Sequence, residues 1–179
     1  MLMDTVQKQW TLAEVHSLPD DGNQYELVRG ELFVTPPPTY NHESIRARLA
    51  MIVVPYVTRE GLGLTFQGHA VMRHDGSEVG PDLMVRAGHR GPDAGWDNAP
   101  VPMLIVEIAS PGTRRRDREQ KRSLYMEAGV EEYWTIDPER REVTVVRPGA
   151  ADVVVTGELL SQPRGAEQPL AFDMARLFD

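Results

Sequence analysis

The chain has 179 residues, 41% of them hydrophobic, so it can bury a sizeable core without disulfides or structural metals. It contains no cysteine, which excludes disulfides, thiolate nucleophiles and cysteine zinc sites, and its five histidines lack zinc-site spacing. The formal net charge of −8 argues against a protein that coats nucleic acid by bulk charge, although a local basic groove remains open.

The start of the chain lacks a basic flank followed by an apolar core, and no apolar run reaches membrane-spanning length. We therefore expect a cytoplasmic protein without a membrane partner. We also expect a single domain over residues 1–179, with its core elements at about residues 40–137.

The first predicted elements are a short helix and a β-hairpin. Thr11 and Glu14 have the spacing of a capping box, which starts a helix that ends near Ser17. Residues 25–28 and 31–35 then flank an Arg-Gly turn, which indicates an antiparallel hairpin. We expect these elements to form a lid or an edge of the domain.

A long helix is predicted from Asn41, as its N-cap, to about Thr58. Its apolar stripe consists of Ile45, Leu49, Ile52, Val53 and Tyr56. His42 falls on this stripe, either as a hydrogen-bonded core histidine or as a group aimed at a cleft. Glu43 either favours the positive end of the helix or acts beside His42 as an accessory residue.

Two strands are predicted next, at residues 64–72, interrupted at Gly68, and at residues 79–85. The second carries the carboxylate of Asp82 on the face of Met84. A Pro-Asp pair by itself is typical of a turn or of the start of a strand. Residues 87–99, rich in Gly, Asp and Asn, are predicted to form a loop.

Residues 101–108 form an apolar run that predicts a buried strand with one exception, Glu107. Because side chains alternate along a strand, Glu107 shares a face with the apolar Met103 and Ile105. An unpaired ionised carboxylate is costly to bury, so Glu107 needs a metal ion, a cation or a raised pKa.

The following helix supplies a candidate cation. Lys121, Leu124, Tyr125 and Ala128 form one helical stripe, which Asp117 extends by a turn. Lysine occurs only at positions 8 and 121, against seventeen arginines, and its compact ammonium can lose a proton as arginine cannot. Lys121 either points into the interior or snorkels to solvent.

Gly129 is predicted to end this helix, and residues 132–136 to form a strand parallel to residues 101–108. Basic residues crowd the start of the helix, namely Arg114, Arg115, Arg116, Arg118 and Arg122. They either spread into solvent or contact phosphate. A hairpin at residues 142–147 and 152–156, an irregular stretch at 157–169 and a helical turn within 170–178 complete the prediction.

Several segments together resemble the Uma-type family of putative restriction endonucleases, within the PD-(D/E)XK nuclease superfamily. The resemblance covers roughly residues 10–150 and rests on Tyr25-Glu26-Leu27, Gly30-Glu31-Leu32, Pro36-Pro37-Pro38, His42, Pro81-Asp82, residues 104–111, Asp117, Lys121, Tyr125 and residues 129–134. It implies an α/β (α+β) fold with a restriction-endonuclease-like core, in which helices flank a mixed central sheet and β-hairpins extend both ends.

The resemblance also implies a DNA endonuclease that depends on Mg²⁺, with Mn²⁺ as a substitute. Asp82 and Glu107 would hold the metal, and hard divalent ions do take oxygen ligands. The superfamily places its lysine two residues after the glutamate, where this chain has Ala109, so Lys121 is the implied replacement. His42, Glu43, Asp117 and Tyr125 are candidate accessory residues, and Arg114, Arg115, Arg116 and Arg118 are candidate phosphate contacts.

Two alternatives to a DNA endonuclease remain open at this stage. The fold could serve as a catalytically silent module that binds nucleic acid or protein, or the substrate could be RNA or a smaller phosphodiester. Cleavage of both strands of a duplex needs two sites, so a homodimer is a further expectation.

Overall fold

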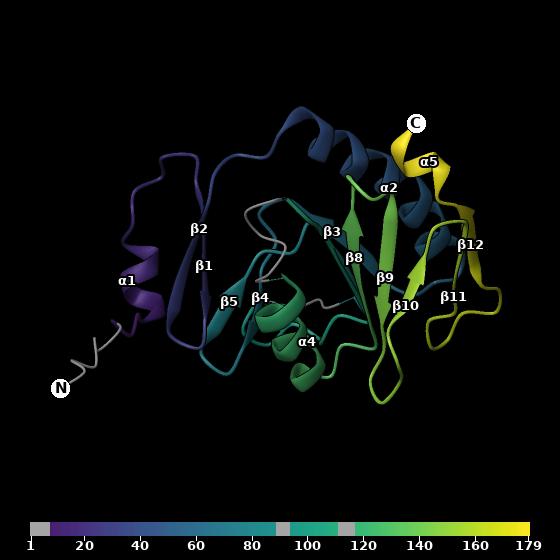
Figure 1. The fold of residues 1–179 in the computed structure, drawn as a ribbon. Helices are drawn as coiled ribbons and strands as arrows, with labels where there is room; N and C mark the ends of the chain where they lie inside the picture. The colour runs from purple at the N-terminus through teal and green to yellow at the C-terminus, as the bar shows by residue number, and fades with distance from the viewer. Residues whose placement is uncertain (1–7, 89–93, 111–116) are drawn as a thin grey trace.

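A computed structural model of the chain describes residues 8–88, 94–110 and 117–179. Its central element is a six-stranded sheet with the order β10-β9-β8-β7-β6-β3 (Figure 1). The strands are β3 (Leu64–Gln67), β6 (Leu83–Arg86), β7 (Leu104–Ile108), β8 (Glu132–Asp137), β9 (Glu142–Val146) and β10 (Val153–Val155). Strands β7 and β8 are parallel, as predicted, and the other neighbours are antiparallel, so the sheet is mixed.

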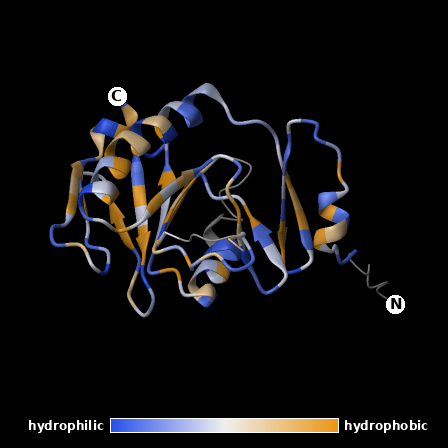
Figure 2. Cartoon of the chain, turned by 180° about the vertical axis from the view of Figure 1, so that it is seen from behind, coloured by the Kyte–Doolittle hydropathy of each residue, from blue (hydrophilic) through white to orange (hydrophobic). Residues whose placement is uncertain are grey.

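Helices cover both faces of this sheet (Figure 1). The helix α2 (Tyr40–Arg59) lies on one face, and α4 (Arg122–Ala128), preceded by the π-helical turn η1 (Asp117–Lys121), lies on the other. Alternate residues of β7 face the two helices, because Val106 packs with Leu49 of α2 whereas Ile105 packs with Leu124 of α4. Figure 2 shows the resulting hydrophobic colouring along the central strands.

The N-terminal hairpin belongs to a second sheet beside the α4 face. After α1 (Leu12–His16), which has the predicted capping box, the hairpin strands pair with two short strands in the order β2-β1-β5-β4. These strands are β1 (Gln24–Val28), β2 (Glu31–Thr35), β4 (Met72–His74) and β5 (Ser77–Val79). Val28 of the hairpin and Val79 of β5 join the core cluster of α4, so this second sheet contributes to the core as well as to an edge.

The C-terminal segment differs from the prediction. Residues 158–161, predicted to be irregular, form β11 (Glu158–Ser161), which pairs with β12 (Leu170–Asp173). Only the last residues are helical, in α5 (Ala175–Phe178). The short strands alternate buried and exposed residues, but their pairing partner lies beyond an irregular connection, which a local pattern does not reveal.

Two predicted boundaries are also wrong. Thr39, not Asn41, caps α2, because its side chain accepts a hydrogen bond from the backbone of His42. The interruption predicted at Gly68 is confirmed, because the stretch divides there into β3 and β4, and the positive φ of 70° at Gly68 turns the chain into the second sheet. The predicted strand at 79–85 divides likewise into β5 and β6 around Pro81.

Within the described ranges, every helix is too short or too polar to cross a membrane.

Candidate active site

The two predicted metal-binding carboxylates come together at adjacent strands. Antiparallel pairing sets Leu83 of β6 opposite Val106 of β7, which brings Asp82, just before β6, next to Glu107. The backbone N–H of Ile108 donates a 2.7 Å hydrogen bond to Asp82 Oδ2 and fixes that carboxylate. The Asp82 side chain is 18% exposed and that of Glu107 is 5% exposed, so solvent reaches the site through Asp82.

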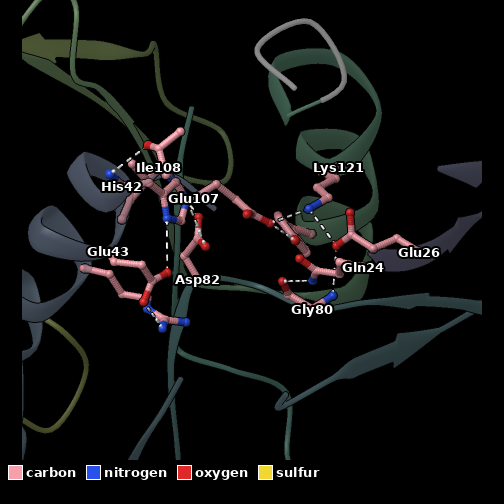
Figure 3. A network of polar contacts seen from close by, with 12 residues as sticks. Gln24, Glu26, His42, Glu43, Gly80, Asp82, Glu107, Ile108 and Lys121 are labelled. Carbon is pink, nitrogen blue, oxygen red and sulfur yellow. Dashed lines mark hydrogen bonds and ion pairs between the residues drawn. The ribbon is translucent and has the colours of Figure 1, made fainter. Parts of the chain in front are cut away.

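Glu107 is held from the helix side by two donors (Figure 3). Lys121 Nζ lies 2.9 Å from Glu107 Oε1, and the hydroxyl of Tyr125 donates to the same oxygen at 2.6 Å. Burial and the nearby carboxylates raise the pKa of Tyr125 well above its usual value, so its phenol stays protonated and remains a donor. The Lys121 side chain is 2% exposed, so the interior orientation is correct and the snorkelling alternative is wrong.

Glu26 is the residue that the sequence interpretation missed. Its Oε1 lies 2.8 Å from Lys121 Nζ and also accepts a 2.9 Å hydrogen bond from the backbone N–H of Gly80. The signal was present, because alternation along β1 places this carboxylate on the face of the buried Val28, the same pattern that singled out Glu107. We had expected the hairpin to lie at an edge, where a glutamate is ordinary.

His42 approaches from the first turn of α2, on the opposite side of the carboxylates. Its Nε2 lies 3.2 Å from Asp82 Oδ1 and its Nδ1 lies 3.5 Å from Glu43 Oε1. Burial alone lowers the pKa of His42, but the hydrogen bond and negative charge of Asp82, together with Glu43, outweigh it and raise the pKa overall. Glu43 also pairs with Arg46. The histidine therefore faces the site and orients Asp82.

Five other predicted site residues are not placed by this geometry. Arg114, Arg115 and Arg116 lie outside the described residues. For Asp117 and Arg118 the backbone is described but the side chains are not. Of the basic group at the helix start, Arg122 is described, and its guanidinium forms a 2.7 Å ion pair with Asp152.

The donor set fits a hard divalent cation. Asp82 and Glu107 offer carboxylate oxygens from adjacent strands, and such ions prefer oxygen ligands. No group of three or more His, Cys, Asp or Glu side chains with metal-binding geometry occurs in residues 8–88, 94–110 and 117–179. An ion held by Asp82 and Glu107 would thus complete its shell with water and substrate oxygens, as Mg²⁺ commonly does.

Comparisons with known proteins agree with this architecture. The pattern of the Uma2 family, described as "Putative restriction endonuclease", matches residues 12–175. The crystal structure of a putative nuclease belonging to DUF820 from Anabaena variabilis is similar to this chain, with a TM-score of 0.78 and 22% sequence identity. The alignment covers 94% of this chain and 97% of that chain, so the two share a fold. No curated protein matches.

Proposed function

Because the chain belongs to the Uma2 family of putative restriction endonucleases, we propose that it is a metal-dependent endonuclease that hydrolyses phosphodiester bonds in DNA. The observation that carries this proposal is the 2.9 Å contact between Lys121 and Glu107. It supports the view that the helix supplies the ammonium that Ala109 cannot supply from the strand. The fold alone would not carry the proposal, because one fold serves many functions.

Each residue of the site has a separate task in this proposal. Asp82 and Glu107 hold the cation, and the ammonium of Lys121 stabilises the negative charge that develops on the phosphate. Tyr125 fixes the orientation of Glu107 through its hydroxyl, and His42 fixes that of Asp82. A bound Mg²⁺, for which Mn²⁺ can substitute, would supply positive charge beside the scissile phosphate and activate water as the nucleophile.

The substrate requires a contact surface for phosphates outside the site. We propose Arg114, Arg115, Arg116 and Arg118 for this role, because arginine pairs well with phosphate and these residues lie three to seven positions before Lys121 in the chain. Reversal of two of these charges should weaken DNA binding and flatten its salt dependence. Since each site cuts one strand, we also propose that a homodimer cuts duplex DNA, which sedimentation at micromolar concentration tests.

A second candidate is a catalytically silent module that uses the same fold to bind nucleic acid or protein. The burial of Glu107 favours this candidate, because the Glu107 side chain is only 5% exposed and one of its oxygens already accepts from both Lys121 and Tyr125. A cation would have to enter this closed arrangement from the side of Asp82.

Cleavage assays separate the two candidates. Supercoiled plasmid, single-stranded DNA and RNA are incubated with Mg²⁺ or Mn²⁺ and either the wild type, Asp82→Ala or Lys121→Ala, with Glu158→Gln, an exposed position on β11, as the control. We expect the wild type and the control to cleave DNA, both site variants to fail, and a chelator to abolish cleavage. If a folded, metal-binding wild type cleaves none of the substrates, the proposal is wrong and the binding module is favoured.

A further inference from the structure

We propose that Glu26, on strand β1 of the N-terminal hairpin, is a positioning residue that holds both Lys121 and the Asp82 segment in the active site. This inference rests on the proposed nuclease function and extends its active site beyond the central sheet. It assigns a catalytic purpose to the second sheet, which carries none of the residues expected to hold the metal.

The ammonium of Lys121 is the first group that Glu26 holds. Lysine has a flexible four-carbon stem, and a single contact would allow the ammonium to pivot about Glu107. Glu26 Oε1 at 2.8 Å and Glu107 Oε1 at 2.9 Å contact the ammonium together, so it is anchored from two strands that belong to different sheets. Figure 3 shows Lys121 between these two carboxylates. The position of its charge is therefore set by the hairpin as well as by β7.

The backbone of Gly80, two residues before Asp82, is the second group that Glu26 holds. Its N–H donates to Glu26 Oε1 at 2.9 Å, and its carbonyl accepts from Gln24 Nε2 at 2.8 Å. Strand β1 thus holds both polar groups of Gly80 (Figure 3). A Cβ at this position would come within 2.4 Å of Gln24 Nε2, so glycine permits the close approach.

One oxygen atom, Glu26 Oε1, makes both of these contacts. Glu26 Oε1 contacts Lys121 and also Gly80, so it ties the position of the proposed charge-stabilising group to the segment that carries Asp82. Small displacements of catalytic groups reduce rates strongly, and residues that orient such groups matter for the same reason. A loss of the Glu26 charge should therefore reduce turnover while the binding of DNA changes little.

The alternative is that Glu26 serves only the stability of the fold. Two substitutions distinguish the alternatives. Glu26→Gln keeps the size and an oxygen acceptor for Gly80 but removes the charge that anchors Lys121. Glu26→Asp is the second variant and retains the charge. Glu158→Gln is the control, an exposed glutamate on the distant hairpin of β11 and β12.

The presence of only two lysines makes a direct readout feasible. In protein labelled at lysine with ¹³Cε and ¹⁵Nζ, without metal or DNA, Lys8 is half-exposed and Lys121 is buried, so NMR signals of the two ammonium groups are separable. We expect Glu26→Gln to move the Lys121 signal towards that of Lys8 and to speed its proton exchange with water. We expect Glu158→Gln to leave the signal unchanged.

Cleavage kinetics with plasmid DNA and Mg²⁺ complete the test. We expect kcat to fall by about 10- to 100-fold in Glu26→Gln, with KM nearly unchanged. An unmoved Lys121 signal in a folded Glu26→Gln overturns the inference, and so does a moved signal with wild-type kcat. If Glu26→Gln does not fold, Glu26→Asp decides, because it keeps the charge but shortens the side chain that reaches Lys121; an unmoved Lys121 signal or wild-type kcat in that variant overturns the inference. A wild type that cleaves nothing refutes the proposed nuclease instead, and the NMR comparison then decides the anchoring alone.

Discussion

Substitution of the buried Tyr125 by phenylalanine should destabilise the protein measurably, although the aromatic ring is retained. The change removes one hydroxyl, which donates a 2.6 Å hydrogen bond to Glu107 Oε1 in a fully buried setting. The ring contact with Tyr133, at 5.1 Å between centroids, remains. Hydrogen bonds to charged groups contribute about 1.5 to 3 kcal/mol, and no buried apolar area is lost, so this range is the whole expected effect.

Thermal unfolding followed by calorimetry measures this effect. For a chain of 179 residues, 1 kcal/mol shifts Tm by about 2 to 4 °C, so Tyr125→Phe should lower Tm by about 3 to 12 °C. The matched control is Tyr40→Phe, because Tyr40 is 90% exposed and its hydroxyl faces water. A decrease for Tyr125→Phe that does not exceed the decrease for Tyr40→Phe would refute the proposed bond to Glu107 as a source of stability.

Two further predictions concern residues away from the site. Glu60 Oε2 accepts hydrogen bonds from the backbone N–H groups of Glu167 and Gln168, and the bond from Gln168 is the main reason that the pKa of Glu60 lies below its ordinary value of 4.5. The stability that the ionised Glu60 contributes is present above pH 4.5 and is lost as the pH falls through the lowered pKa of the folded protein. The Tm difference between wild type and Glu60→Gln should therefore be largest at pH 7 and should narrow in acid. A Tm difference that widens in acid contradicts the stabilising role of the ionised Glu60. Gly129 ends α4 with a left-handed φ of 88°, and a Cβ added there would meet no atom within 4 Å, so Gly129→Ala should cost about 1 kcal/mol through backbone strain alone, which a urea titration measures. Gly157→Ala, at a position that also has space but no positive φ, should be near neutral in the same urea titration, and equal effects of the two substitutions would contradict the strain argument.

Much of the central sheet could be predicted from the sequence because its signals are local. The apolar run that ends at Ile108, Gly129 at the end of α4 and the strand after it define a parallel unit, which the structure contains. Glu107 was identified because a carboxylate on an apolar face conflicts with the burial of its neighbours. Lys121 was identified by its place on the buried stripe of the helix.

Other features were missed because they depend on contacts between distant segments or because a local signal was not used. Strand β11 was missed because its partner β12 follows an irregular connection. Alternation along β1 does place Glu26 on the face of Val28, but the burial of that face depends on the packing of the hairpin against Gly80 and Lys121, 54 and 95 residues away in the chain. The division of residues 79–85 at Pro81 was also missed, although proline is unfavourable inside a central strand.

The helical position of Lys121 has a physical explanation in the turn that precedes α4. Residues Asp117–Lys121 form a π-helical turn, a rare geometry that is frequent at functional sites, and Lys121 is its last residue. Lys121 and Tyr125 are four residues apart, so both side chains point to the same face of the helix and both contact Glu107 Oε1. A lysine at position 109 would approach Glu107 from the end of β7, whereas Lys121 approaches it from the helix that packs on the sheet. The long, flexible side chain of lysine can bring its ammonium to Glu107 from either element. What the proposed chemistry requires is the position of the ammonium, which Glu26 and Glu107 fix together, so the lysine can change its place in the sequence without changing its place in the site.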